Sequence, residues 1–151
     1  MIWTICFLVK GNKVCLAMKK RGHGVGRWNG TGGKPLEGES LDVTAERETF
    51  EEIGVTLSNL TKVAEIEFKD LPSGSSHFAT AYISTEWKGE PEESEEMRPE
   101  WFDAEDLPFD QMWSADKVWI PMVLSGNHIH AVFEYSEGDT LVGSYISELK
   151  S

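Results

Sequence analysis

Three glutamates stand close together in one short segment of the chain, at positions 48, 51 and 52. Residues three and four positions apart lie on the same face of a helix, so in a helix these carboxylates would crowd together and repel one another. A helix gains nothing from this repulsion unless a cation neutralises it. Carboxylate oxygens without Cys or His at metal-ligand spacing suit hard divalent ions such as Mg²⁺ or Mn²⁺. The segment therefore predicts a metal-binding helix face made by Glu48, Glu51 and Glu52.

A glycine-rich segment with the sequence GTGGK, residues 30–34, precedes these glutamates. Glycines let backbone N–H and carbonyl groups approach a ligand closely, and Lys34 adds a positive charge for phosphate. Arg47 can hold a carboxylate by a bidentate bond. Together these groups predict metal-assisted attack of water on a phosphoanhydride, with a glutamate taking the proton of the water. The alternative is an acidic amphipathic helix after a flexible loop, with no chemistry.

The segment from Gly33 to Val55, GKPLEGESLDVTAERETFEEIGV, resembles the Nudix box G-x5-E-x7-R-E-U-x-E-E-x-G-U. Every fixed letter is present, and Thr49 departs mildly at a position where the family usually has a larger apolar residue. Residues 18–34, 95–102, 107–113 and 138–149 resemble the branch of the family that hydrolyses oxidised purine nucleoside triphosphates. The resemblance implies an α/β fold, an α/β/α sandwich around a mixed sheet, as one domain over residues 1–151. It implies conversion of 8-oxo-dGTP or 2-hydroxy-dATP to monophosphate and pyrophosphate, which cleans the nucleotide pool.

The resemblance also implies a Mg²⁺ site, with Mn²⁺ as a substitute. Its ligands would be one backbone carbonyl and four carboxylates: Gly32, Glu48, Glu51, Glu52 and Glu96. Arg47 would position a carboxylate. The general base stays open between Glu48, Glu52 and Glu96.

A substrate pocket is implied by the same resemblance. The residues that read the base would be Asn29, Trp113 and Asp116. Thr4 and Lys19 would lie near the sugar and phosphates, and the pocket would be lined by Thr31, Gly32, Gly33 and Lys34. Phe68 and Trp119 are further candidates. From residue type alone, Asn29 also fits a turn, Trp113 and Trp119 fit a core, and Asp116 fits a helix cap.

Departures from the family pattern fall in this pocket: His23, Thr31, His77 and Ala115 stand where the family branch has an aromatic residue, a phenylalanine, a methionine and an aspartate. A close pair of carboxylates titrates as a coupled unit with one raised pKa. Because Ala115 removes one partner, we expect Asp116 to ionise readily and to act as an acceptor. That predicts a preference for 8-oxo-dGTP over 2-hydroxy-dATP.

Two other functions compete with this one. The first is hydrolysis of another Nudix substrate, such as a dinucleoside polyphosphate, ADP-ribose or an ordinary dNTP. The second is a catalytically silent nucleotide-binding module. The intact set of Arg47, Glu48, Glu51 and Glu52 argues against the second, because a binding module has no need of it.

The elements that must position these residues can be read from periodicity and turn signals. Residues 41–53 read as a helix with Ser40 as N-cap and Gly54 as its end, and with Val43, Phe50 and Ile53 as a core stripe. Other expected elements are a strand hairpin (3–9 and 13–18) around Gly11-Asn12, a long loop (19–35) with a short strand near Trp28, two strands (60–68 and 78–87), a short helix (117–124) and a second hairpin (128–135 and 140–146). The acidic run at 90–102 reads as a solvated loop.

Composition limits the possible partners. The chain has 151 residues and a formal net charge of -12, so it lacks the basic surface that binds a long nucleic acid. No apolar run is long enough for a transmembrane helix, and the N-terminus lacks the features of a secretory signal. Cys6 and Cys15 lie in apolar runs and read as reduced, buried thiols. We expect a cytoplasmic monomer that acts on a small nucleotide.

Overall fold

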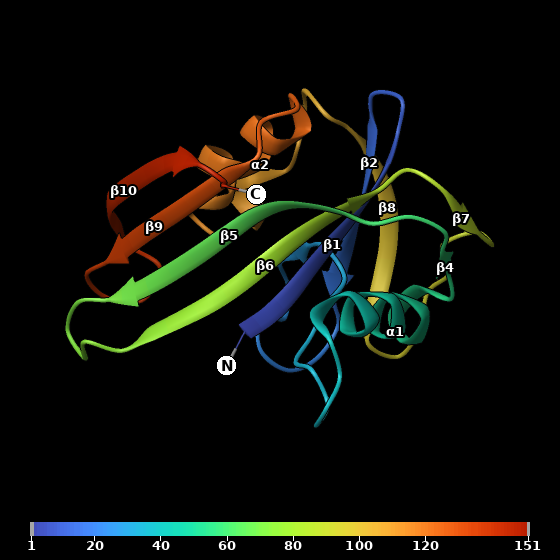
Figure 1. Cartoon of the computed structure of the whole chain (residues 1–151), viewed down its shortest axis with the longest axis horizontal. Coiled ribbons are helices and arrows are strands. Elements are labelled where there is room, and N and C mark those ends of the chain that lie inside the picture. The colour runs from blue at the N-terminus through green and yellow to red at the C-terminus, as the bar shows by residue number, and fades with distance from the viewer. Residues whose placement is uncertain (1, 151) are drawn as a thin grey trace.

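A mixed β-sheet of eight strands forms the centre of the computed structural model, which describes residues 2–150 (Figure 1). Its strands are β1 (Ile2–Lys10), β2 (Lys13–Lys19), β3 (Trp28–Asn29), β5 (Thr61–Asp70), β6 (Ser76–Ser84), β8 (Met97–Asp103), β9 (Ile129–Tyr135) and β10 (Leu141–Glu148). The order is β10-β9-β5-β6-β1-β2-β3, and β8 also pairs with β2. Pairs β1–β6 and β5–β9 are parallel and the other pairs are antiparallel. A small second sheet joins β4 (Thr56–Leu57) to β7 (Trp87–Lys88).

The two α-helices, α1 (Leu41–Ile53) and α2 (Asp116–Leu124), cover opposite faces of this sheet (Figure 1). Successive residues of a strand point to opposite faces. On β1, Cys6 packs with Ala45 of α1, whereas the Phe7 ring lies 5.8 Å from the ring of Trp119 in α2. A short 3₁₀ helix, η1 (Phe109–Gln111), precedes α2. The expected α/β/α sandwich is confirmed.

Helix α1 has the bounds and the caps that the sequence predicts. The side chain of Ser40 accepts a hydrogen bond from the N–H of Val43 at 3.3 Å. Gly54 has a φ of 75° in the left-handed region, and its N–H donates to the carbonyl of Phe50 at 2.9 Å. Only glycine adopts this backbone conformation at no steric cost, which fixes where the helix ends.

The predicted core stripe of this helix is wrong at two of its three positions. Ile53 is buried, but Val43 is 49% and Phe50 58% exposed. The face that packs on the sheet is instead mostly small or polar: Thr44, Ala45, Thr49, Glu52 and Ile53. Buried threonines are tolerated because their hydroxyls are bonded: Thr44 donates to the Ser40 carbonyl at 2.8 Å and Thr49 bonds Thr31 at 2.7 Å.

The acidic run is a strand over part of its length, which corrects the loop prediction. Residues 97–103 form β8 and pair with β2 over seven residues. The strand is anchored by Met97, which is buried against Ile53 and Val55 despite its charged neighbours. The two hairpins are confirmed, and Cys6 and Cys15 are buried and free. Among residues 2–150, no helix is long and apolar enough to cross a membrane.

The contrast between Ile53 and Phe50 generates a prediction about stability. Ile53→Ala removes a fully buried side chain and should lower the free energy of unfolding by about 2–5 kcal/mol. Phe50→Ala, on the exposed side of the same helix, should stay within about 0.5 kcal/mol of wild type. Denaturant unfolding of both variants checks this, and equal losses would show that the face assignment is wrong.

Candidate active site

Arg47 ties the loop before α1 to the acidic face of the helix. Its Nε and Nη2 atoms donate to the two oxygens of Glu39 at 2.8 and 2.9 Å. This bidentate bond holds the pKa of Glu39 at about 2. The Nη1 atom donates to Glu48 at 2.7 Å and to Glu51 at 3.2 Å, and Nη2 also reaches the carbonyl of Lys34 at 3.2 Å. One cation therefore fixes both the loop and two of the three predicted carboxylates.

The glycine-rich loop is held against β1 by backbone bonds. Cys6 and Thr31 exchange N–H···O bonds of 2.6 and 3.0 Å, and the N–H of Thr4 donates to the Gly33 carbonyl at 2.9 Å. A Cβ on Gly32 would lie 1.8 Å from the carbonyl oxygen of Thr4. The absence of side chains is thus what brings this loop close to the strand.

The absence of a side chain at Gly33 likewise lets the loop approach helix α1 closely. A Cβ there would lie 2.7 Å from the carboxyl carbon of Glu48. The loop therefore lies directly against the acidic face of α1, as the sequence predicts for the two segments.

Glu52 is the buried member of the acidic face. Its side chain is 3% exposed, and one oxygen accepts the N–H of Gly32 at 2.9 Å. Burial raises the pKa of Glu52 to about 8, and repulsion from Glu48 and Glu96 adds to the rise. Burial also raises the pKa of Glu48, although Arg47 opposes that rise. Arg47 forms an ion pair with Glu48, whereas no ion pair within residues 2–150 includes Glu52.

Glu96 reaches the same region from the loop before β8. It bonds Arg21 at 3.1 Å and lies 3.6 Å from the ammonium group of Lys19, and the Arg21 hydrogen bond leads the lowering of its pKa. The Ser94 hydroxyl donates to the carbonyl of Glu52 at 2.7 Å and accepts the N–H of Glu96 at 3.2 Å. Ser94 thus fixes this loop to the end of α1.

The donor set fits a hard divalent cation. It consists of carboxylate oxygens and one backbone carbonyl: Gly32, Glu48, Glu51, Glu52 and Glu96. Within the described range 2–150, no three His, Cys, Asp or Glu side chains already surround one point as metal ligands would. Arg47 engages two of the glutamates, and Lys19 with Arg21 engages Glu96. Binding of a cation would therefore exchange these ion pairs for metal bonds.

Trp113, the expected stacking residue, packs against residues 23–27, which connect β2 to β3. The ring of His23 stacks on it with centroids 5.4 Å apart, and the guanidinium of Arg27 lies 4.1 Å from its centroid. Gly24 leaves the space that this packing needs, since a Cβ there would come within 3.6 Å of the indole. Trp113 is partly buried, so it is neither a core residue nor an open platform.

Asp116 is buried, and the prediction that it ionises readily is wrong. Its two oxygens accept the N–H of Trp113 and the indole N–H of Trp119, each at 3.1 Å. Burial raises the pKa of Asp116 to about 7 even without an aspartate at position 115. Ala115 is itself fully buried at the N-cap of α2. Desolvation therefore raises the pKa of Asp116, an effect that was expected only from a second carboxylate at position 115.

The other expected pocket residues fall into two groups. Trp119 is fully buried and supports Asp116, while the hydroxyl of Thr31 points inward to Thr49 and Cys6. Partly buried or exposed residues remain accessible: Lys19, Asn29, Lys34, Phe68 and His77. Phe68 and His77 are directly opposite in the β5–β6 pair, so they share one face of the sheet. The side chain of Thr4 is buried and bonds Gly33.

Trp3 is a site residue that sequence reasoning missed. In the sequence it lies in the predicted strand 3–9 without a role in the site, but its side chain is 37% exposed. The ammonium group of Lys34 lies 4.6 Å from the centroid of its ring, a cation–π contact. The residue type and spacing of Trp3 do not distinguish it from a core aromatic residue, and only the fold shows that the start of this strand is exposed.

Comparisons with known proteins agree with this geometry. Residues 3–123 match the model of the NUDIX domain family. The chain is 37% identical to an oxidized purine nucleoside triphosphate hydrolase of Danio rerio, over 97% of this chain and 94% of that protein. It is likewise 37% identical to the protein of that name from Mus musculus, over 99% and 96% of the two chains. The crystal structure of the mutator MutT protein from Bacillus halodurans superposes with a TM-score of 0.85 at 27% identity, over 97% of each chain.

The close approach of the loop to β1 generates a second prediction. Gly32→Ala would drive a methyl group into the Thr4 carbonyl, so the backbone must separate and the melting temperature should fall by several degrees or more. Gly38→Ala is the matched control, because that glycine also has a positive φ, 78°, but nothing within 4 Å of its Cβ position. Equal melting temperatures for the two variants would contradict the packing described here.

Proposed function

This chain belongs to the NUDIX family, and we propose that it hydrolyses oxidised purine nucleoside triphosphates, 8-oxo-dGTP above all, to monophosphate and pyrophosphate. The observation that carries the proposal is the acidic face of α1 lying directly against the Gly32–Gly33 backbone, with Arg47 joining the two. The relatives of Danio rerio and Mus musculus, which span nearly the whole chain, support the substrate class.

Members of the family generally need a divalent metal ion, and we assign Mg²⁺ to the carboxylates of α1 and Glu96. When bound, the ion neutralises phosphate oxygens and supports attack by water. The protein contributes the rest. Lys19 and Lys34 supply positive charge for the triphosphate, and Arg47 holds Glu48 and Glu51 beside the loop.

The proton of the attacking water goes to a glutamate among Glu48, Glu52 and Glu96. Hydrogen bonding to Arg21 lowers the pKa of Glu96, which makes it the weakest base of the three. Glu48 and Glu52 both have raised pKa values, chiefly from burial. We therefore place the base on α1.

Base recognition rests on Asn29, Trp113 and Asp116. The carbonyl oxygen of the Asn29 side chain accepts the N–H of Gly30 at 2.7 Å, which orients its amide group. We propose that residues 1–151 work as one domain, in the cytoplasm and as a monomer. The net charge of -12 supports a free nucleotide, rather than a long nucleic acid, as the substrate.

A panel of oxidised and ordinary nucleotides, assayed for pyrophosphate and orthophosphate with Mg²⁺, tests the proposal. It predicts one pyrophosphate per substrate consumed and the highest kcat/KM on 8-oxo-dGTP. A preference for ADP-ribose or a dinucleoside polyphosphate would overturn the substrate, and absence of hydrolysis on all of them would favour the silent binding module.

The buried carboxylate of α1 generates a third prediction. Glu52→Gln should reduce kcat by about 100-fold or more, because it removes a metal-centred charge, while the amide oxygen still accepts the Gly32 N–H. The protein should fold at least as stably as wild type, since the neutral amide lacks the charge whose burial raises the pKa of Glu52. Glu46→Gln, at an exposed position of the same helix, is the control and should keep wild-type activity. Full turnover in Glu52→Gln at saturating Mg²⁺ would contradict the assignment.

The titration of Asp116 near neutrality generates a fourth prediction. As pH rises through about 7, Asp116 changes from a donor to an acceptor, and an acceptor matches the N1–H and N2–H₂ groups of a guanine-type edge. The ratio of kcat/KM for 8-oxo-dGTP to that for 2-hydroxy-dATP should therefore increase between about pH 6 and 8. Asp116→Asn cannot titrate, so its ratio should be flat. A slope that persists in Asp116→Asn would assign the effect to another group, such as His23 or His77.

A further inference from the structure

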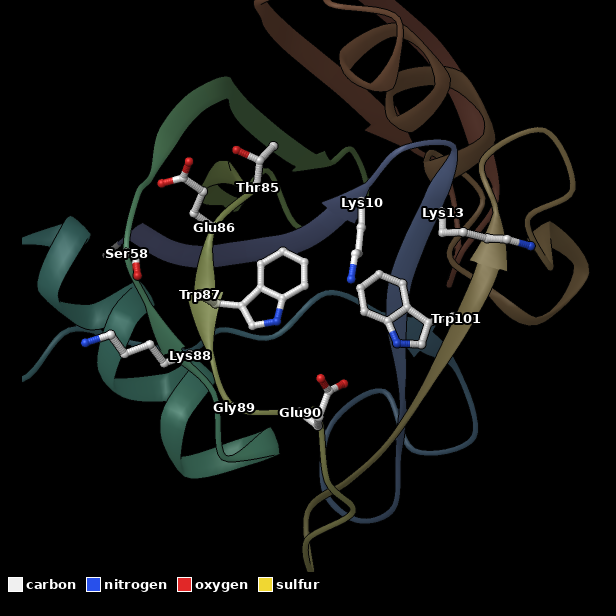
Figure 2. A pocket seen from close by; sticks show the side chains of 10 residues that line it. All are labelled: Lys10, Lys13, Ser58, Thr85, Glu86, Trp87, Lys88, Gly89, Glu90 and Trp101. Atoms are coloured by element: carbon white, nitrogen blue, oxygen red, sulfur yellow. The ribbon is translucent and has the colours of Figure 1, made fainter.

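A second concave site lies away from the acidic face of α1 and shares no residue with it. This groove has a volume of about 960 Å³, within the usual size of small-molecule sites. It is lined by residues near the β1–β2 turn, the β4–β7 pair and β8: Lys10, Lys13, Ser58, Thr85, Glu86, Trp87, Lys88, Gly89, Glu90 and Trp101 (Figure 2). The groove brings two tryptophans and three lysines together in a chain of net charge -12.

The two tryptophans form a rigid aromatic wall. The rings of Trp87 and Trp101 stack with centroids 5.9 Å apart and planes at 25°. Trp87 packs on the buried cluster that contains Leu8 and Ile53, so its position is fixed from below. A third ring between the indoles would need about 7 Å of separation, which the pair does not offer. A planar ligand must therefore lie on the exposed part of Trp101, which is 36% accessible.

A positive charge stands beside this wall. Figure 2 shows the side chain of Lys10 pointing towards the space between the two indoles. Lys13 is neutralised by Asp103, whereas no carboxylate within residues 2–150 forms an ion pair with Lys10 or Lys88. An anionic group on a ligand could therefore form an ion pair with Lys10.

Acceptors complete the lining. Glu90 lies at one edge of the groove with its carboxylate towards the two indoles, whereas Ser58, Thr85 and Glu86 lie at the rim and point away from the indoles (Figure 2). Carboxylates next to an aromatic wall and an ammonium group suit a ligand with hydroxyl donors, such as a ribose. An aromatic ring, a sugar and one phosphate occur together in a nucleotide.

We propose that this groove is a second binding site, separate from the catalytic one, for a nucleoside phosphate. The base stacks on Trp101, the phosphate meets Lys10, and the sugar hydroxyls donate to Glu90. The proposal does not depend on the substrate of the catalytic site, because the groove shares no residue with it.

Proton–nitrogen NMR of the indole N–H groups in the full chain tests this, with AMP as the probe and without metal. AMP should shift the signals of Trp87 and Trp101 saturably, and adenosine and inorganic phosphate should each bind about 5-fold or more weakly. Shifts confined to Trp113 would place AMP in the catalytic site alone and overturn the proposal. Equal shifts with phosphate alone would reduce the groove to an anion patch and overturn it too.

Matched variants sharpen the test. Lys10→Gln should weaken the AMP response of Trp101 by about 5-fold, and Lys117→Gln, an exposed lysine of α2, should leave it unchanged. Trp101→Leu should abolish the response of Trp87. All three variants should keep wild-type hydrolysis, since none touches the catalytic site. An AMP response that survives in both Lys10→Gln and Trp101→Leu would contradict the proposed contacts.

Discussion

Repulsion among the carboxylates of α1, held in check by Arg47, is the constraint on which the rest of the site depends. The guanidinium group donates hydrogen bonds to Glu39, Glu48, Glu51 and the carbonyl of Lys34. A lysine has no planar fork and cannot make this set of bonds. Because the network joins loop to helix, the glycine loop, the backbone of Lys34 and the acidic face occupy fixed relative positions. Glu52 lies outside the network and remains buried without a cation, which is why its pKa rises furthest from the ordinary value among these glutamates.

Strand β1 of the sheet positions the loop, because its backbone N–H and carbonyl groups pair with those of the loop. Thr4, Cys6, Thr31 and Gly33 form the junction, and no side chain at position 32 intervenes. Two departures from the family pattern meet at this junction. The resemblance places larger apolar residues at the positions of Thr31 and Thr49, and in this structure the two buried hydroxyls satisfy each other through a hydrogen bond of 2.7 Å.

The sequence was sufficient to predict the fold class, the bounds and caps of α1, and both hairpins, because these depend on local signals such as Ser40, Gly54 and Gly11-Asn12. The buried face of α1 was not predictable from hydropathy. Thr49 and Glu52 are inside because partners far along the chain, Thr31 and Gly32, bond them, while Phe50 is outside. Strand β8 was hidden for a similar reason, since its pairing with β2 outweighs its charged residues.

In the expected substrate pocket, too, the sequence could not predict which side chains are buried. The absence of a second aspartate at position 115 suggested an Asp116 that ionises readily, but burial raises its pKa, and burial follows from the packing of α2 on the sheet. Trp3 was not predicted as a site residue, because an aromatic residue at the start of a strand is also typical of a core. Only the fold shows that this end of the strand is exposed. In both cases the missing information is tertiary.

The most direct measurement is binding of Mn²⁺ to the full chain without nucleotide, followed by the loss of the free-ion signal in electron paramagnetic resonance. The account predicts saturable binding that Glu48→Gln weakens by about 10-fold or more and that Glu46→Gln leaves unchanged. Equal Mn²⁺ affinity in wild type, Glu48→Gln and Glu46→Gln would show that the acidic face of α1 is not the metal site, and would contradict the account at its centre.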